Sequence, residues 1–337
     1  MIIFLPNTHH ITMAAVTVSS CPPFLVLSSC LYYCFLMPAA IHVPHVGSLS
    51  FNLSFSQPQS PGLSQLINCT GDAMLTQDTL ELTRNRFDQS SEGSVGRAKY
   101  TKPVPLWDGA TSEMANFTTT FSFRISLDPR TYSPGDGMAF FLGHFASDIP
   151  SNSTGGSLGL LPHNTNGTGD GTIVAVEFDT HLNPENADIS YSHVAIDVNS
   201  VKSTATKDTT SPTKNLTSSS SVMTATVRYV NVTKLLAIQL VINGTSYNVN
   251  TTVDLRSYLP ERVAVGFSAA TGYAGELHQI LSWSFTSTLQ EPPALLPVLT
   301  PDNIQNSKKR SVGTVTVAVL VPLLFLFVCA AVQTSDA

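Results

Sequence analysis

The central part of the chain, from about Leu49 to Leu289, alternates apolar and polar residues over short runs. Because successive side chains of a β-strand point to opposite faces, this period of two predicts half-buried strands. No helical period longer than a couple of turns occurs there. The predicted strands are Phe117–Ile125, Gly137–Leu142, Ile173–Asp179, His193–Val198, Thr224–Val230, Leu235–Ile242, Arg262–Ala269 and Gln279–Phe285.

Many short strands with turn-rich links favour an antiparallel sandwich, in which alternate residues of two sheets interdigitate. The polar stretch Ser203–Ser221 is predicted to be a mobile surface loop, and the proline-containing stretch after residue 289 a stiff, extended linker. The predicted organisation is a leader (1–48), one β-sandwich domain (49–289), a linker (290–311), a membrane segment (312–332) and a short tail (333–337).

The N-terminal segment Phe24–Ala40 is apolar, too short for a membrane span, and ends on small residues, as the apolar region and cleavage site of a secretory signal do. The usual basic start is absent, because no Lys or Arg precedes Arg84. An uncleaved N-terminal anchor is the alternative interpretation, and Met13 is a second candidate start.

Near the other end, Val312–Val332 has 21 residues and no charge, the length that crosses a hydrocarbon core of about 30 Å. It predicts a transmembrane helix. Lys308, Lys309 and Arg310 precede it, whereas the positive-inside rule prefers basic residues on the other side of an exported domain's anchor. A removable tail of the GPI type is therefore a competing interpretation.

The composition fits an extracellular protein. A net charge of −6 without a basic stripe argues against a nucleic-acid partner. Outside the leader and the C-terminal apolar segment the chain has Cys69 alone, so no disulfide framework supports the fold. Glycosylation sequons begin at Asn52, Asn68, Asn116, Asn152, Asn166, Asn215, Asn231, Asn243 and Asn250. These features predict a glycoprotein of the secretory pathway, at the plasma membrane with an extracellular domain.

The stretch Val174–Val198 carries many groups that bind cations. Glu177 and Asp179 stand two apart, so on a strand they face the same side. A loop then returns Asn183 and Asp188, and His193 opens the next strand. Oxygen ligands suit Ca²⁺, and a set that adds imidazole suits Mn²⁺ or another transition ion. Two ions sharing Asp179 and Asp188 would explain why carboxylates are tolerated beside a core.

The run "VAVEFDT", the spacing of Asn183, Asp188 and His193, and "HVAIDVNSVKS" resemble the signature of the legume, or L-type, lectins. The likeness covers about 240 residues and includes "GRAKYTKPVPLWD", "NFTTTFSF", "GDGMAFFL", "GGSLGLL" and "RVAVGFSAATG" through "ILSWSF". It implies an all-β fold, a concanavalin A-like jelly-roll β-sandwich, and a carbohydrate-binding protein. The linker and C-terminal apolar segment resemble the ectodomain of plant lectin receptor-like kinases, although the sequence contains no HRD or DFG kinase motif.

The resemblance also implies which residues bind the metals. Mn²⁺ would be held by Glu177, Asp179, Asp188 and His193 with waters, and Ca²⁺ by Asp179, Asn183, Asp188 and the backbone carbonyl of His181. In that family the ions are structural: they fix a loop so that its neighbours can bind a sugar.

The sugar contacts implied by the resemblance come from four loops and fall on Asp136, Gly156, Asn183, and the turn Tyr273 and Ala274. A carboxylate accepts from sugar hydroxyls, an amide donates, and glycine offers a backbone N–H where a side chain would leave no room. The family also has a cis peptide before this aspartate, here Gly135–Asp136. His181 stands where many relatives carry an aromatic ring, usually Phe, that stacks on the sugar, so binding of a single sugar is expected to be weak.

Two other functional classes compete with a carbohydrate-binding module. A glycoside hydrolase would use Glu177 and Asp179 as acid and nucleophile, but a metal-bound carboxylate is a poor general acid, so we expect no enzyme. A lectin-fold receptor or decoy could instead bind a protein, peptide or extracellular nucleotide. The retained Asp136, Gly156 and Asn183 favour sugar. The resemblance leaves a homodimer through paired sheet edges as an open alternative.

Overall fold

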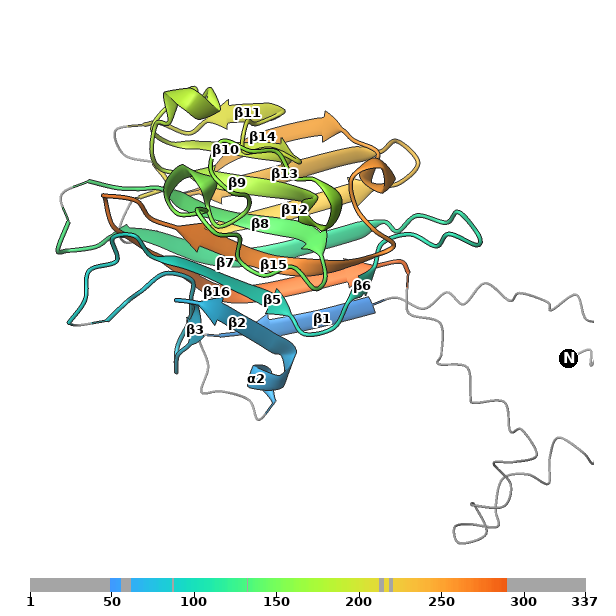
Figure 1. Cartoon of the computed structure of the whole chain (residues 1–337), viewed down its shortest axis with the longest axis horizontal. Helices are drawn as coiled ribbons and strands as arrows, with labels where there is room; N and C mark the ends of the chain where they lie inside the picture. Colours follow the sequence, from blue (N-terminus) through green and yellow to red (C-terminus); the bar gives the residue numbers. More distant parts are fainter. Residues whose placement is uncertain are drawn as a thin grey trace, which may run out of the picture. The chain divides into compact units, whose positions relative to one another are not determined.

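The structure is a computed structural model that describes residues 49–55, 62–86, 88–131, 133–211, 215–217 and 221–289. In these residues the strands form two antiparallel sheets that lie one behind the other (Figure 1). The first has the order β14 (Thr245–Thr252), β13 (Leu235–Ile242), β12 (Met223–Val230), β7 (Phe117–Leu127), β16 (Glu276–Ser287), β4 (Leu80–Glu81) and β3 (Met74–Leu75), and β1 (Leu49–Ser54) also pairs with β16.

The second sheet has the order β11 (Ala205–Asp208), β10 (His193–Val198), β9 (Ile173–Asp179), β8 (Gly137–His144), β15 (Arg262–Ala270), β5 (Val95–Tyr100) and β2 (Ile67–Gly71), with β6 (Val104–Pro105) on β15. Helical structure in the described residues is limited to short turns, which are α2 (Leu63–Leu66), η1 (Gly155–Ser157), η2 (Gly169–Gly171), η3 (Pro184–Asn186) and η4 (Leu255–Ser257). The predicted all-β sandwich is thus confirmed.

Aromatic side chains from both sheets fill the space between them. Phe121 on β7 lies 4.9 Å, ring centroid to ring centroid, from Phe267 on β15, and Phe123 lies 4.7 Å from Phe178 on β9. The Trp283 ring is fully buried, 4.9 Å from Phe267, and its Nε1 atom donates to Thr119 Oγ1. A buried indole N–H needs such a partner. Because alternate residues of each strand enter this core, the alternating sequence pattern corresponds directly to the sandwich interior.

The predicted strands at β9, β10 and β13 have the observed bounds, and the other five run a little further than predicted. The prediction of a loop over Ser203–Ser221 is wrong at Ala205–Asp208, which forms β11 and pairs with β10. The sequence ATKD has no apolar alternation, because β11 lies at the edge of its sheet and its side chains are not buried. The polar edge strand β14 escaped prediction for the same reason.

The predicted leader, linker and membrane segment, residues 1–48, 290–311 and 312–332, lie outside the described residues. In the part of the chain that the structure describes, no helix has the length and apolar character needed to cross a membrane.

Strand β9 is buried along its whole length. One face, with Val174, Val176 and Phe178, belongs to the core between the sheets. The other face contributes Ile173 and Ala175 to a second apolar cluster, which Leu158, Leu160 and Leu161 from the connection between β8 and β9 also join. Loops therefore cover the outer face of the second sheet, and the side chains that continue this face lie in a protected environment.

Candidate functional site

The register of β9 and β10 gathers the candidate cation-binding side chains on that outer face. His193 pairs with Asp179, and Ala195 pairs with Glu177. Because alternate positions share a face, Glu177 and Asp179 lie on the side opposite Phe178, and His193 lies beside them. Each of these three side chains is buried, with exposed fractions of 2%, 1% and 0%. The strand positions predicted from the sequence thus meet in space.

The loop from Thr180 to Ser192, here named the metal loop after its predicted role, returns the remaining groups to this face. The backbone N–H of His181 donates to Asp179 Oδ1 at 2.7 Å, and that of Asn183 donates to Asp188 Oδ2 at 2.6 Å. The turn η3 follows Asn183, and Ala187 takes a left-handed backbone conformation at its end. These bonds leave one oxygen of each carboxylate for another partner. Ligand atoms of Asp179, Asp188 and His193 all lie within 4.8 Å of one another.

The imidazole of His193 is oriented as metal-binding histidines are. Its Nδ1 lies 3.1 Å from the carbonyl oxygen of Ser190, which can only accept, so Nδ1 carries a proton and donates. In the neutral ring the Nε2 lone pair then faces carboxylates, with Glu177 Oε1 at 3.4 Å and Asp188 Oδ1 at 3.9 Å. A lone pair directed at anionic oxygens is unfavourable unless a proton or a cation lies between them.

The pKa shifts of the cluster also favour a bound cation. Burial and the neighbouring carboxylates of Glu177 and Asp188 raise the pKa of Asp179, and burial raises the pKa of Asp188 to about 6. Burial alone lowers the pKa of His193, but Glu177 and Asp188 outweigh it and raise the pKa overall. A divalent cation would offset this accumulation of negative charge.

Asn183 supplies a further test of whether these residues fit a calcium ion. Its Oδ1 atom is buried and has no hydrogen-bond partner among the described residues. A buried amide oxygen without a partner is rare, and a bound ion is one of its explanations. Carboxylate and amide oxygens are what Ca²⁺ prefers, and the Asp/His set suits Mn²⁺. The residues present therefore fit both ions.

The predicted sugar contacts converge beside this cluster. A methyl group built on Gly155 would lie 3.7 Å from Asp136 Oδ1, and one on Gly272 would lie 3.1 Å from Asp136 Oδ2. Gly156 packs against Asn183. The Gly135–Asp136 peptide is cis, as the resemblance implied. The turns carrying Asp136, Gly156 and Asn183 thus come together next to the loop that begins at Gly272.

The two predicted contacts in the turn after Gly272, Tyr273 and Ala274, point in different directions. Ala274 lies inward, since a methyl group on Gly135 would be 3.4 Å from its Cβ and 3.5 Å from His181 Nδ1. The Tyr273 side chain is fully exposed. His181 and Ala274 therefore lie on the same side of the Asp136 turn, whereas Tyr273 is free to contact a larger ligand.

Sequence reasoning missed four residues around the site. Asn186 Nδ2 donates to the carbonyl of Gly156 at 3.2 Å and joins the metal loop to η1. Ser203 Oγ donates to Glu177 Oε1. Asp197 is fully buried, and burial together with Glu177 raises its pKa well above the usual range. The fourth is Thr180, in the middle of the run "EFDTH". A same-face count along His193–Val198 would have found Asp197.

Comparison with known proteins decides the family. The model of the legume lectin domain matches residues 48–298. The chain belongs to the legume lectin family. It is 41% identical over 255 residues to agglutinin-2 of Cladrastis kentukea, an alignment covering 73% of this chain and 83% of that protein. It is 38% identical over 281 residues to the bark leucoagglutinin of Maackia amurensis, covering 81% and 93% of the two chains.

The same family appears among solved structures. The lectin UEA-II in complex with galactose superposes with a TM-score of 0.63 at 37% identity, covering 72% of this chain and 99% of that one. Legume lectins are carbohydrate-binding proteins without enzymatic activity. The expectations of a legume lectin domain and of a protein that is not an enzyme are therefore confirmed.

Proposed function

We propose that this legume lectin binds glycans in a Ca²⁺- and Mn²⁺-dependent manner at the site formed by Asp136, Gly156 and Asn183. The observation that carries the proposal is the meeting of these residues beside the acidic cluster of Asp179, Asp188 and His193. The Asp136 carboxylate would accept from two sugar hydroxyls, while the Asn183 amide N–H₂ would donate to one.

The metals would supply the rigidity that this arrangement needs. Mn²⁺ would take Glu177, Asp179, Asp188 and His193, and Ca²⁺ would take Asp179, Asn183, Asp188 and the His181 carbonyl. A bound Ca²⁺ would hold Asn183 by Oδ1 and leave Nδ2 for the sugar. His181 would lie against the apolar face of the sugar.

A glycan array with and without EDTA tests this proposal. We expect binding that EDTA abolishes and that added Ca²⁺ and Mn²⁺ restore. Galactose-terminated and mannose-terminated glycans both belong on the array, because the solved relative UEA-II is complexed with galactose. Binding to no glycan would contradict the proposal and favour a receptor for a protein, peptide or nucleotide.

Two substitutions test the site itself. Asp136→Ala and Asn183→Ala remove the central acceptor and donor, so we expect each to abolish glycan binding while the protein stays folded. Matched controls are Asp78→Ala and Asn248→Ala, because both side chains are exposed and lie in the first sheet or its turns. Glycan binding that survives in both site variants would refute the assignment.

We further propose that the lectin domain is displayed at the plasma membrane through the segment Val312–Val332, with glycans on its sequons. The apolar length of that segment and the apolar stretch Phe24–Ala40 support this location. Surface labelling of intact cells, before and after treatment with a phospholipase that cleaves GPI anchors, tests it. Retention after treatment supports a transmembrane helix, release supports a GPI anchor, and no surface signal contradicts the proposal.

A further inference from the structure

A buried acid–base pair lies close to the carbohydrate site and belongs to none of the predicted ligand sets. Glu276 and His278 begin strand β16, and neither side chain is exposed to solvent. His278 Nε2 lies 3.3 Å from Glu276 Oε2. Buried ionisable groups destabilise a fold unless they are paired and hydrogen-bonded. We therefore expect this pair to have a specific function in the protein.

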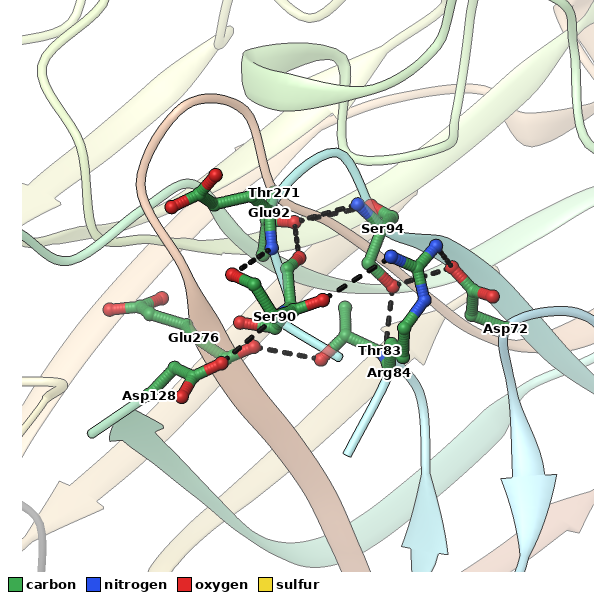
Figure 2. Close-up of polar contacts among 10 residues, drawn as sticks. Asp72, Thr83, Arg84, Ser90, Glu92, Ser94, Asp128, Thr271 and Glu276 are labelled. Atoms are coloured by element: carbon green, nitrogen blue, oxygen red, sulfur yellow. Dashed lines mark hydrogen bonds and ion pairs between the residues drawn. The ribbon is translucent and has the colours of Figure 1, made fainter. Parts of the chain in front are cut away.

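The hydrogen bonds of Thr83 fix how the pair is arranged. The single hydroxyl proton of Thr83 is donated to the carbonyl oxygen of Glu276 at 2.9 Å (Figure 2). The Thr83 oxygen must therefore accept from His278 Nδ1, which lies 3.0 Å away. With Nδ1 committed as a donor, Nε2 faces the Glu276 carboxylate. The buried His278 ring thus lies against the Glu276 side chain and limits its orientation.

Glu276 in turn holds the metal loop. Its Oε2 accepts a 2.6 Å hydrogen bond from Thr180 Oγ1, and Thr180 stands between Asp179 and His181. The backbone N–H of Thr180 donates to the carbonyl oxygen of Asp136 at 2.9 Å. The Asp136 carboxylate accepts from the backbone N–H of Gly272. Gly272 leads back along the chain to Glu276, so these contacts form a closed ring around Asp136.

The loop Gly272–Gly275 is anchored at both ends. Figure 2 shows Ser94 hydrogen-bonded to Thr271 just before the loop and Thr83 hydrogen-bonded to Glu276 just after it. Thr271 N donates to the carbonyl of Ser94 at 2.9 Å, and Gly93 N donates to that of Gly272 at 2.9 Å. At the other end Asp128 N donates to the carbonyl of Gly275 at 3.1 Å. Because both ends of this short loop are attached to neighbouring segments, a change in the position of the Glu276 side chain can reach Asp136 through it.

We propose that Glu276, oriented by His278, is a positioning residue that couples the metal loop to the loop Gly272–Gly275 through Thr180 and thereby fixes the Asp136 carboxylate. An effect of this coupling on sugar binding rests on the proposed function. The direct consequence of the coupling is structural: when cations order the metal loop, the loop Gly272–Gly275 becomes ordered as well.

Hydrogen–deuterium exchange of the full chain, with and without Ca²⁺ and Mn²⁺, tests the coupling without any sugar. In the wild type we expect the cations to slow exchange in peptides covering both 180–192 and 271–276. Thr180→Val replaces the hydroxyl with a methyl group of similar size, so it removes the hydrogen bond and keeps the shape of the side chain. It should keep the protection of 180–192 and reduce the protection of 271–276 about tenfold, the equilibrium effect of losing a hydrogen bond to a charged group.

Thr226→Val is the matched control, because this hydroxyl bonds Thr120 within the first sheet. It should behave as the wild type. Protection of 271–276 that is unaffected by the cations in the wild type, or that persists in Thr180→Val, would overturn the coupling.

A double-mutant cycle extends the test to binding of methyl α-D-galactoside and of methyl α-D-mannoside. If Thr180 and Glu276 act as one unit, Thr180→Val and Glu276→Gln each weaken binding about tenfold, and the double variant is no weaker than the single ones. Additive losses would contradict the coupling. A wild type that binds no glycan at all would refute the proposed function, while the exchange measurement would still decide the coupling.

Discussion

The backbone of Gly156 packs directly against the Asn183 carboxamide: a methyl group built on Gly156 would lie 2.6 Å from Asn183 Oδ1 and 2.9 Å from Nδ2. This contact joins η1 to the metal loop, two segments far apart in the sequence. Any side chain at position 156 would displace the Asn183 amide. The orientation of Asn183 therefore depends on the glycine at this position.

Gly156→Ala should therefore reduce glycan binding at least tenfold, because the added methyl group must push the Asn183 carboxamide out of position. The fold should be little affected, since the clash is with a loop side chain outside the core between the sheets. Titration calorimetry with a glycan that binds the wild type measures the effect. Gly171→Ala is the control, because a methyl group there meets no atom within 4 Å. Equal affinity of both variants would contradict the prediction.

His181→Phe should tighten glycan binding up to about tenfold, because a larger apolar ring buries more of the sugar face. His181→Ala should weaken binding, so that affinity falls in the order Phe, His, Ala. The same calorimetric titration ranks the three proteins. A Phe variant that binds no better than the wild type would show that position 181 does not stack on the sugar.

Metal removal should destabilise the protein more at pH 7 than at pH 5. The pKa of Asp188 is raised to about 6, and that of Asp179 is raised as well. Since these groups keep protons that the unfolded chain loses near pH 4, the metal-free protein loses stability as pH rises from about 4 to 6. Cations that replace the protons restore it.

Thermal unfolding at both pH values, with EDTA or with Ca²⁺ and Mn²⁺, measures this difference. A cation concentration 100 times the Kd would stabilise the fold by about 2.7 kcal/mol at pH 7, and by clearly less at pH 5 where protons compete. An equal gain at the two pH values would exclude these carboxylates as the ligands.

Asp128→Asn should cost about 1–3 kcal/mol of unfolding free energy at pH 7. Burial alone would raise the pKa of Asp128, but hydrogen bonds from Arg130 and from the Ser91 N–H outweigh it and hold the pKa well below its usual range. Such a group stabilises the fold above its unfolded pKa of about 4, and the contribution disappears as pH falls further. Denaturant titrations of wild type and variant should therefore converge toward pH 2, and a constant difference would refute this origin.

Much of the fold was predictable from local pattern. Strands such as β9 and β10 alternate or run apolar because their side chains enter a core, and their bounds agree with the structure. Edge strands were not predictable in the same way. Ala205–Asp208 and Thr245–Thr252 bury little, so hydrogen bonding to a neighbouring strand, which leaves no trace in composition, is what makes them strands.

The acidic cluster was also predictable, because five groups lie within one hairpin of the sequence. The contacts that other parts of the chain make with this cluster were not predictable from the local sequence. Asp136 and Gly156 were assigned by resemblance, and their meeting with Asn183 depends on how distant loops pack. Nothing local marked Thr180, Glu276 or His278, since a threonine, a glutamate and a histidine in strand-like sequence are common at any surface.

The sequence by itself determined the class of fold, the hairpin rich in acidic residues and the family signature, because these depend on short-range periodicity and spacing. Only the tertiary structure decided that Asp136, Thr180, Glu276 and Gly272 close a ring. The physical reason is that their hydrogen bonds join residues up to 136 positions apart, and such pairs are brought into contact by the stacking and strand order of two sheets rather than by any property of the residues themselves.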